Sequence, residues 1–298
     1  MEKYKNISPQ TIAKTLQLEV FRYSDIGTVP ASFHPEAEIV YVTKGSIDVR
    51  VFGKRYTVSE NSYMLIMPNV LHEISYGPCV DFWTKTFSER DCEEFFKNEF
   101  TINLKCAFFK CNETDSMRYF SFCLVPSMVF EYRIVESVEK PEVLDNLLYS
   151  DYTVALVDIL RTCIDSGTAV RYDSADEIYL KSVIEYISRN YICHTSAVKY
   201  AGYLGRVEST IRRKIMSVCR RMGYSYRYID FVYMCRTEHA KNLLRKTNKY
   251  IYEIAEECGF LNDTRFRRLF LRYAGVRPNL YRDINYSLDN RIFSFGDD

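Results

Sequence analysis

The chain has 298 residues, 47% of them hydrophobic and 27% charged, which is long enough for two domains that each bury a core. An apolar leader and an apolar run of 18 residues are both absent, so we expect a soluble cytoplasmic protein with no membrane partner. The net charge of +1 hides an asymmetry, because residues 1–174 contain 18 basic and 25 acidic side chains, whereas residues 175–298 contain 22 and 14. The basic half predicts a polyanionic partner, since neutralised phosphates release counterions.

Short alternating runs between Phe33 and Phe87 predict antiparallel β-strands. Turn-forming pairs such as Lys44-Gly45 and Gly53-Lys54 separate the runs, at the spacing expected of a barrel or sandwich. The predicted strands are residues 39–43, 47–51, 56–58, 63–67 and 82–87. We therefore expect an α+β multidomain protein whose N-terminal half is an antiparallel β-barrel.

Polar side chains in this barrel mark a candidate pocket. His34 and Glu38 are four residues apart, so both point to the same face of an extended strand, and His72 falls in the returning strand region. This pattern resembles the cupin barrel, in which one motif places a metal-binding His and Glu ahead of a turn glycine. His34, Glu38 and Gly45 match that spacing, while Ser32 stands where the motif has another His.

Three interpretations of these side chains remain open. Two histidines and one carboxylate can bind a metal with a position left free. The same groups can hydrogen-bond a small polar effector, with Tyr41 or Trp83 as apolar walls, or the histidines can be partly exposed residues without a ligand. Because the motif is incomplete, we predict an effector pocket formed by His34, Glu38, Tyr41, His72 and Trp83, with no metal and no cofactor.

Helical periodicity begins after Ser88, with candidates at 91–97 and 142–164. The longer candidate has more apolar surface than one small barrel readily covers, so it either joins two copies in a homodimer or packs on its own barrel. Turn-forming residues then indicate a linker. The predicted division is 1–165 for an effector-sensing and dimerisation domain, 166–177 for the linker, 178–286 for a DNA-binding domain and 287–298 for a tail.

Two short helices joined by a tight turn are predicted between Tyr250 and Phe270. Gly259 suits the left-handed conformation that ends a helix, and Asn262 or Asp263 can accept hydrogen bonds from the first amides of the next helix. That second helix has a cationic face opposite its apolar side chains, formed by Arg265, Arg267, Arg268 and Arg272. Such a helix fits the DNA major groove, although a solvated basic face is the alternative.

A weaker copy of this arrangement lies upstream. Tyr200–Gly205 precedes a periodic run at 208–215, and Val207 occupies the position where a capping hydroxyl is usual. Residues 224–258 contain no Gly or Pro, which predicts one connecting helix at 228–246. Its length is about 28 Å at roughly 1.5 Å per residue, comparable with the pitch of B-DNA, so the two units are spaced for adjacent major grooves.

The helical half resembles the AraC/XylS family of transcription regulators. The residues that match its signature are Arg236, Ala240, Leu243, Leu244, Ile254, Ala255, Gly259, Phe260, Phe266, Arg268, Phe270, Gly275, Pro278, Tyr281 and Arg282. The resemblance implies effector-responsive transcription control, usually activation, with promoter DNA and RNA polymerase as partners. By position it implies DNA contacts from Ser209, Arg212, Arg213, Asp263, Thr264, Arg265 and Arg268. Between Ile211 and Gly223 the chain is about three residues longer than the family pattern.

Two other classes of function compete with a non-enzymatic regulator. A metal-dependent cupin enzyme would hold iron, manganese or zinc with His34, Glu38 and His72 and would contain stoichiometric metal. An RNA-binding or nonspecific nucleoid protein would show little preference between its own upstream region and random duplex. No aromatic stacking motif in the sequence supports RNA binding.

Overall fold

The structure is a computed structural model that describes residues 19–23, 27–87, 103–110, 168–191 and 196–283. The two helices expected at 91–97 and 142–164 lie outside these residues, and with them the proposed dimer contact. Within the described part, no helix combines the length and apolar character that crossing a bilayer requires.

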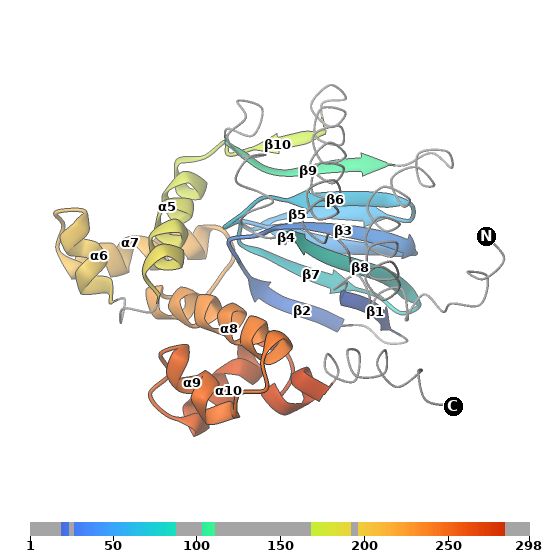
Figure 1. Cartoon of the computed structure of the whole chain (residues 1–298). Coiled ribbons are helices and arrows are strands. Elements are labelled where there is room, and N and C mark those ends of the chain that lie inside the picture. The colour runs from blue at the N-terminus through green and yellow to red at the C-terminus, as the bar shows by residue number, and fades with distance from the viewer. Residues whose placement is uncertain (1–18, 24–26, 88–102, 111–167, 192–195, 284–298) are drawn as a thin grey trace, which may run out of the picture.

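Ten antiparallel strands form two sheets in the first half of the chain (Figure 1). The strands are β1 (Glu19–Tyr23), β2 (Gly27–Ser32), β3 (Ala37–Lys44), β4 (Ser46–Val51), β5 (Lys54–Ser59), β6 (Ser62–Ile66), β7 (His72–Tyr76), β8 (Val80–Phe87), β9 (Leu104–Lys110) and β10 (Ala169–Arg171). One sheet has the order β1-β8-β3-β6-β9-β10 and the other β2-β7-β4-β5. All five predicted strands are confirmed, and the expected β-rich domain with them.

The strand positions follow from alternation of side chains. In β4, Ile47, Val49 and Val51 are buried while the residues between them are more exposed, and β7 repeats the pattern in register with it. β3 differs, because it is buried on both faces from Ala37 to Val42. It lies between β8 and β6 at the centre of the larger sheet, which explains its continuous apolar composition.

Six helices precede a further helical stretch at 278–283 in the second half of the described chain. They are α5 (Ala175–Asn190), α6 (Ala197–Tyr203), α7 (Glu208–Arg221), α8 (Tyr228–Lys246), α9 (Ile251–Glu257) and α10 (Asp263–Ala274). Helix α8 has the bounds predicted for the connecting helix. Pairs α6–α7 and α9–α10 are the two predicted helix-turn-helix units, one at each side of α8.

Of the segment expected to be a linker, 166–177, the described residues 168–177 are built into both halves. Strand β10 pairs with β9, and α5 begins at Ala175 with the Ser174 hydroxyl accepting from the Glu177 amide. The Glu177 carboxylate in turn accepts from the fully buried ammonium of Lys105 on β9, at 2.8 Å. This buried ion pair fixes the start of α5 against the sheet.

The two halves are packed against each other. Helices α8 and α10 contact β2, which lies at the edge of the smaller sheet and faces the helices in Figure 1. Phe33, just after β2, packs on Phe231 of α8 with ring centroids 6.3 Å apart, and Pro30 lies against Gly275 at the end of α10. Side chains of both halves belong to one continuous apolar core.

Candidate effector pocket and nucleic-acid interface

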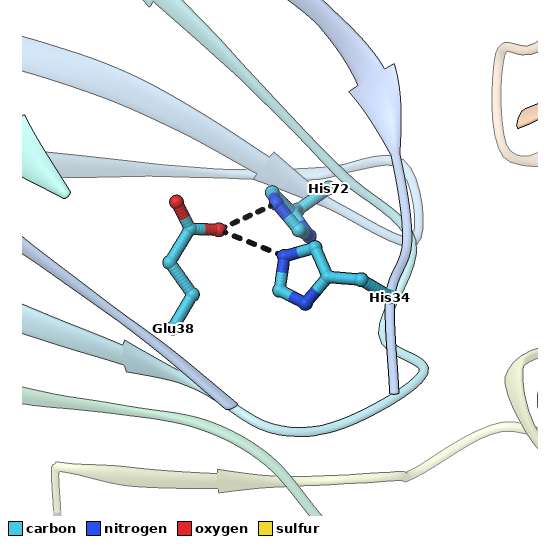
Figure 2. Close-up of side chains that lie close together, drawn as sticks. All are labelled: His34, Glu38 and His72. Atoms are coloured by element: carbon cyan, nitrogen blue, oxygen red, sulfur yellow. Dashed lines mark hydrogen bonds and ion pairs between the residues drawn. The ribbon is translucent and has the colours of Figure 1, made fainter. Parts of the chain in front are cut away.

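His34, Glu38 and His72 converge inside the β domain (Figure 2). The Oε2 atom of Glu38 lies 3.2 Å from Nε2 of His34 and 2.9 Å from Nε2 of His72. All three residues are buried, with exposed fractions of 9%, 7% and 4% for His34, Glu38 and His72. His34 follows β2 rather than sharing a strand with Glu38, so a turn, and not strand alternation, brings this pair together.

The second ring nitrogen of each histidine is fixed by the backbone. Nδ1 of His34 lies 2.9 Å from the carbonyl oxygen of Glu36, and Nδ1 of His72 lies 2.9 Å from that of Val70. A carbonyl oxygen only accepts hydrogen bonds, so both Nδ1 atoms carry hydrogen. In a neutral ring the Nε2 atom then has a free lone pair, and both such atoms point at the same carboxylate oxygen.

Charge in this cluster follows from that arrangement. Burial on its own lowers the pKa of His34, but the hydrogen bond and negative charge of Glu38 outweigh it and raise that pKa to about 9. Burial raises the pKa of Glu38, while the hydrogen bonds from His34 and His72 outweigh it and hold that pKa well below its usual range. A cation between the imidazoles and the carboxylate is therefore favoured, and either a proton or a metal ion can supply it.

The donor set also fits the metal that the cupin resemblance implies. Two imidazole nitrogens and one carboxylate form a set that binds divalent transition metals, and donors about 2.1 Å from a tetrahedral ion are roughly 3.4 Å apart. The distance of 3.2 Å from Glu38 to His34 is close to that value, the distance of 2.9 Å to His72 is shorter, and all three donor atoms lie within 4.8 Å of one another. Backbone carbonyls that fix the outer nitrogens are typical partners of metal-binding histidines.

The cluster lines a cavity of about 110 Å³ that lies between the two halves of the molecule. One wall consists of the cluster, Ser32 and residues of β7 and β8. The opposite wall is formed by helices α5 and α8, and its residues are Ser188, Tyr191, Cys235, Glu238, His239, Lys241, Asn242 and Arg245. No signal in the sequence marks these helix residues as pocket lining, because their role depends on how the halves pack.

Two of the predicted effector contacts lie elsewhere or are not described. Tyr41 is on the opposite face of β3 from Glu38, stacks on Tyr63 at 4.2 Å and donates to the Asn61 side chain. It does not line the cavity, and its odd separation from Glu38 along the strand is the signal that could have excluded it. Trp83 lies in β8 opposite Tyr41, but its side chain is outside the described residues.

Helix α10 has the geometry expected of a recognition helix. The Asn262 side chain accepts from the Arg265 amide, as predicted, and Gly275 ends the helix at φ +78°. Phe266, Leu269, Phe270 and Tyr273 are buried, which leaves Thr264, Arg267, Arg268 and Arg272 exposed. Asp263 is half-buried and pairs with Arg267 at 2.7 Å, whereas the half-buried Arg265 donates to the hydroxyl of Tyr233 on α8.

Helix α7 presents the corresponding residues of the first unit. Ser209, Arg212 and Arg213 are exposed, and Arg212 is paired with Glu208 one turn earlier at 2.5 Å. Val207 precedes the helix without a side-chain cap. The helix continues to Arg221, and Met222 follows it as the C-cap.

The C-terminal end of α7 contacts the β4–β5 hairpin. The Arg50 guanidinium donates to the carbonyls of Met222 and Gly223 at 2.8 and 2.7 Å, and its carbon lies 4.1 Å from the centre of the Tyr224 ring. The Tyr224 hydroxyl accepts from the Gly53 amide at 3.0 Å, and any side chain at Gly53 would collide with the Met222 carbonyl. We call these five residues the hairpin clamp.

A buried arginine holds the second unit to α8. Arg236 is 7% exposed and donates to the carbonyl of Gly259 at 2.6 Å and to that of Tyr191 at 3.4 and 3.3 Å. Gly259 has φ +75°, as predicted for the turn, and a Cβ there would press on the Arg236 guanidinium. One side chain thus joins α5, α8 and the α9–α10 turn.

Comparison with known proteins supports both halves. An AraC-like ligand binding domain model matches residues 18–146 and a helix-turn-helix domain model matches residues 204–284, so together they span well over half of the chain. No curated protein sequence is similar enough to count as a match. The sheets and helices described above are the expected parts of those two domains.

Solved structures of ToxT from Vibrio cholerae have a similar fold. Bound to (E)-4-(8-methylnaphthalen-1-yl)but-3-enoic acid, ToxT matches with a TM-score of 0.59 and 12% identity over 90% of this chain and 98% of that one. Unsaturated fatty acid bound ToxT gives 0.57 and 12% over 89% and 93%, and the P21 form gives 0.56 and 13% over 89% and 97%. By its two domains and their order, this chain belongs to the AraC family of transcription regulators.

Proposed function

We propose that the protein binds specific duplex DNA through α7 and α10 and that a small-molecule effector in the cavity between the halves controls this binding. Activation of transcription through RNA polymerase in the cytoplasm, with the protein acting as a homodimer, is part of the same proposal. Ser209, Arg212, Arg213, Asp263, Thr264, Arg265 and Arg268 are the proposed DNA contacts.

One observation supports the link between effector and DNA. Helix α8 joins the two helix-turn-helix units, and its residues Glu238, His239 and Arg245 also form a wall of the cavity. A molecule in the cavity touches the element that sets the spacing between the recognition helices. Differential contact of this kind is what an effector needs in order to shift a conformational equilibrium.

The cavity suits a small polar effector. Its volume of about 110 Å³ and its lining of histidine, carboxylate, lysine and arginine side chains favour a ligand of few atoms with charged or hydrogen-bonding groups. ToxT, which shares only the fold, has been solved with carboxylic acids bound. We propose that His34, Glu38 and His72 form the effector-binding end of the cavity.

Fluorescence anisotropy with two duplexes tests the DNA-binding part. The wild-type protein should prefer a duplex from the region upstream of its own gene over a random duplex of equal length. Arg268→Ala should lose about 1 to 3 kcal/mol of specific binding, because an exposed arginine on a recognition helix can pair bidentately with guanine.

Arg55→Ala is the matched control, because Arg55 is equally cationic and 74% exposed but belongs to β5 and to neither recognition helix. It should leave binding to both duplexes within about 0.5 kcal/mol of wild type. Equal binding of the wild type to both duplexes, at each salt concentration tried, would contradict sequence-specific recognition.

A further inference from the structure

The hydrogen bonds around the two histidines leave a cluster of three inward-facing donors. Both Nδ1 atoms donate to backbone carbonyls, so both Nε2 lone pairs and the Glu38 carboxylate face a common point. A simple buried ion pair needs only one histidine. Two histidines held in the same tautomer by separate carbonyls form a site organised for a cation that accepts several lone pairs at once.

Ser32 leaves one position beside this point open. It is buried, it pairs in register with His72, and it lines the same cavity as the three donors. A serine hydroxyl is a short side chain and a weak ligand for a transition metal, unlike the imidazole that the cupin motif has at this position. The space beside Ser32 opens into the cavity whose far wall belongs to α5 and α8.

We propose that His34, Glu38 and His72 bind one divalent transition-metal ion and that the position vacated at Ser32 is where the effector attaches to that ion. The inference deepens the proposed function, on which its regulatory meaning rests. The ion and Glu38 together have a net charge of +1, so the effector supplies an anionic oxygen or nitrogen donor. Bound there, it lies between the β domain and α8.

Cobalt titration tests the site without any knowledge of the effector. Full-length protein stripped with a chelator and titrated with Co²⁺ should gain visible absorption that saturates at one ion per chain. Equilibrium dialysis followed by elemental analysis should give the same stoichiometry. Absence of stoichiometric binding at neutral pH overturns the proposal, and this result needs no variant.

Variants locate the ion. Glu38→Gln keeps the shape of the side chain and His72→Gln keeps a polar side chain of similar length, but each should weaken Co²⁺ binding more than about 100-fold, because each removes a direct ligand. His239→Gln is the control, since His239 lines the same cavity but lies outside the cluster. It should bind Co²⁺ as the wild type does, whereas equal losses in all three variants would overturn the assignment of the ligands. Circular dichroism confirms that each variant is folded.

Azide and Ser32→His test the open position. Azide, a small anionic ligand, should change the Co²⁺ absorption of the wild type by occupying the free position. Ser32→His should complete the set of protein ligands, tighten Co²⁺ binding about 10-fold or more and abolish the azide effect. A wild-type spectrum that azide leaves unchanged overturns the open position.

The two proposals can fail independently, because every measurement on the metal is made without DNA. Specific DNA binding by a protein that takes up no Co²⁺ would overturn the metal site but would still support the proposed function as a transcription regulator. Stoichiometric Co²⁺ binding by a protein that binds no duplex, with or without the ion, would support the metal site and contradict the proposed DNA-binding function. That result would favour the alternative of a metal-dependent cupin enzyme.

Discussion

The two helix-turn-helix units share a layout but are held in place by different parts of the molecule. In the second unit, Asn262 caps α10, Gly275 ends it, and Arg236 joins the turn to α8, so these hydrogen bonds are internal to the helical half, while α10 also packs on β2. In the first unit, α7 begins at Val207 without a cap and ends in the hairpin clamp of the β domain. Among the described residues, the ligand-binding half therefore hydrogen-bonds to the end of α7, whereas its contact with α10 is the packing of β2.

Removal of the Arg236 side chain should have the largest effect on the stability of the helical half. Arg236→Ala leaves the carbonyls of Gly259 and Tyr191 without their buried donor and should lower the free energy of unfolding of the helical half by about 3 kcal/mol. Urea denaturation followed by circular dichroism measures the change. Arg267→Ala, which removes an exposed arginine from α10, is the control and should stay within about 0.5 kcal/mol. An equal loss of stability in both variants would mean that Arg236 does not hold the α9–α10 turn to α8.

The second unit should contribute more to DNA affinity than the first. Arg268→Ala should cost about 1 to 3 kcal/mol of specific binding and Arg213→Ala less, because the uncapped α7 is less firmly positioned against DNA. Anisotropy titrations with the same upstream duplex compare the two variants directly. A larger loss for Arg213→Ala would reverse the ranking of the units.

Loss of the hairpin clamp should affect the first unit alone. Arg50→Ala removes two charge-assisted hydrogen bonds to Met222 and Gly223, each worth about 1.5 to 3 kcal/mol. Hydrogen exchange should then become faster at Tyr224 and in the last turn of α7, with α10 unchanged. Arg55→Ala, on the neighbouring strand, should alter neither. Faster exchange throughout α10 would show that the clamp supports both units.

A cap restored at α7 should give the smallest effect, and of opposite sign. Val207 is 69% exposed in extended backbone conformation, so Val207→Ser can place a hydroxyl near the free amides at the helix start. We expect a gain of about 0.5 to 1 kcal/mol in stability and firmer DNA contacts from Arg213. Thermal unfolding and anisotropy measure the two effects. No gain in stability would indicate that α7 depends on the β domain for its position, whatever precedes it.

The second unit could be predicted from the sequence because its determinants are local. Gly259 at a left-handed turn and Asn262 at a helix start are one-residue signals, and the structure confirms both. β4, in which buried and more exposed residues alternate, was predicted for the same reason. β2 was missed because Gly27 and Pro30 interrupt its pattern, and β9 because the buried Lys105 resembles a solvent-facing residue until its partner Glu177 is known.

The pocket was only half predictable. His34, Glu38 and His72 were found by residue type and spacing, and the structure brings them together. Tyr41 was chosen for its aromatic character, although strand alternation places it on the other face. Glu238 and His239 could not be chosen at all, because nothing local to α8 shows that β2 packs beside it.

The length of α8 has a mechanical consequence. A straight helix of 19 residues is about 28 Å long at roughly 1.5 Å per residue, and α8 connects the two helix-turn-helix units. A tilt of about 5° moves the far end of such a helix by roughly 2.4 Å, which exceeds the spread of about 0.5 Å in ordinary hydrogen-bond lengths. A slight tilt of α8, whose residue His239 lines the cavity, would therefore be enough to break a hydrogen bond made near its far end.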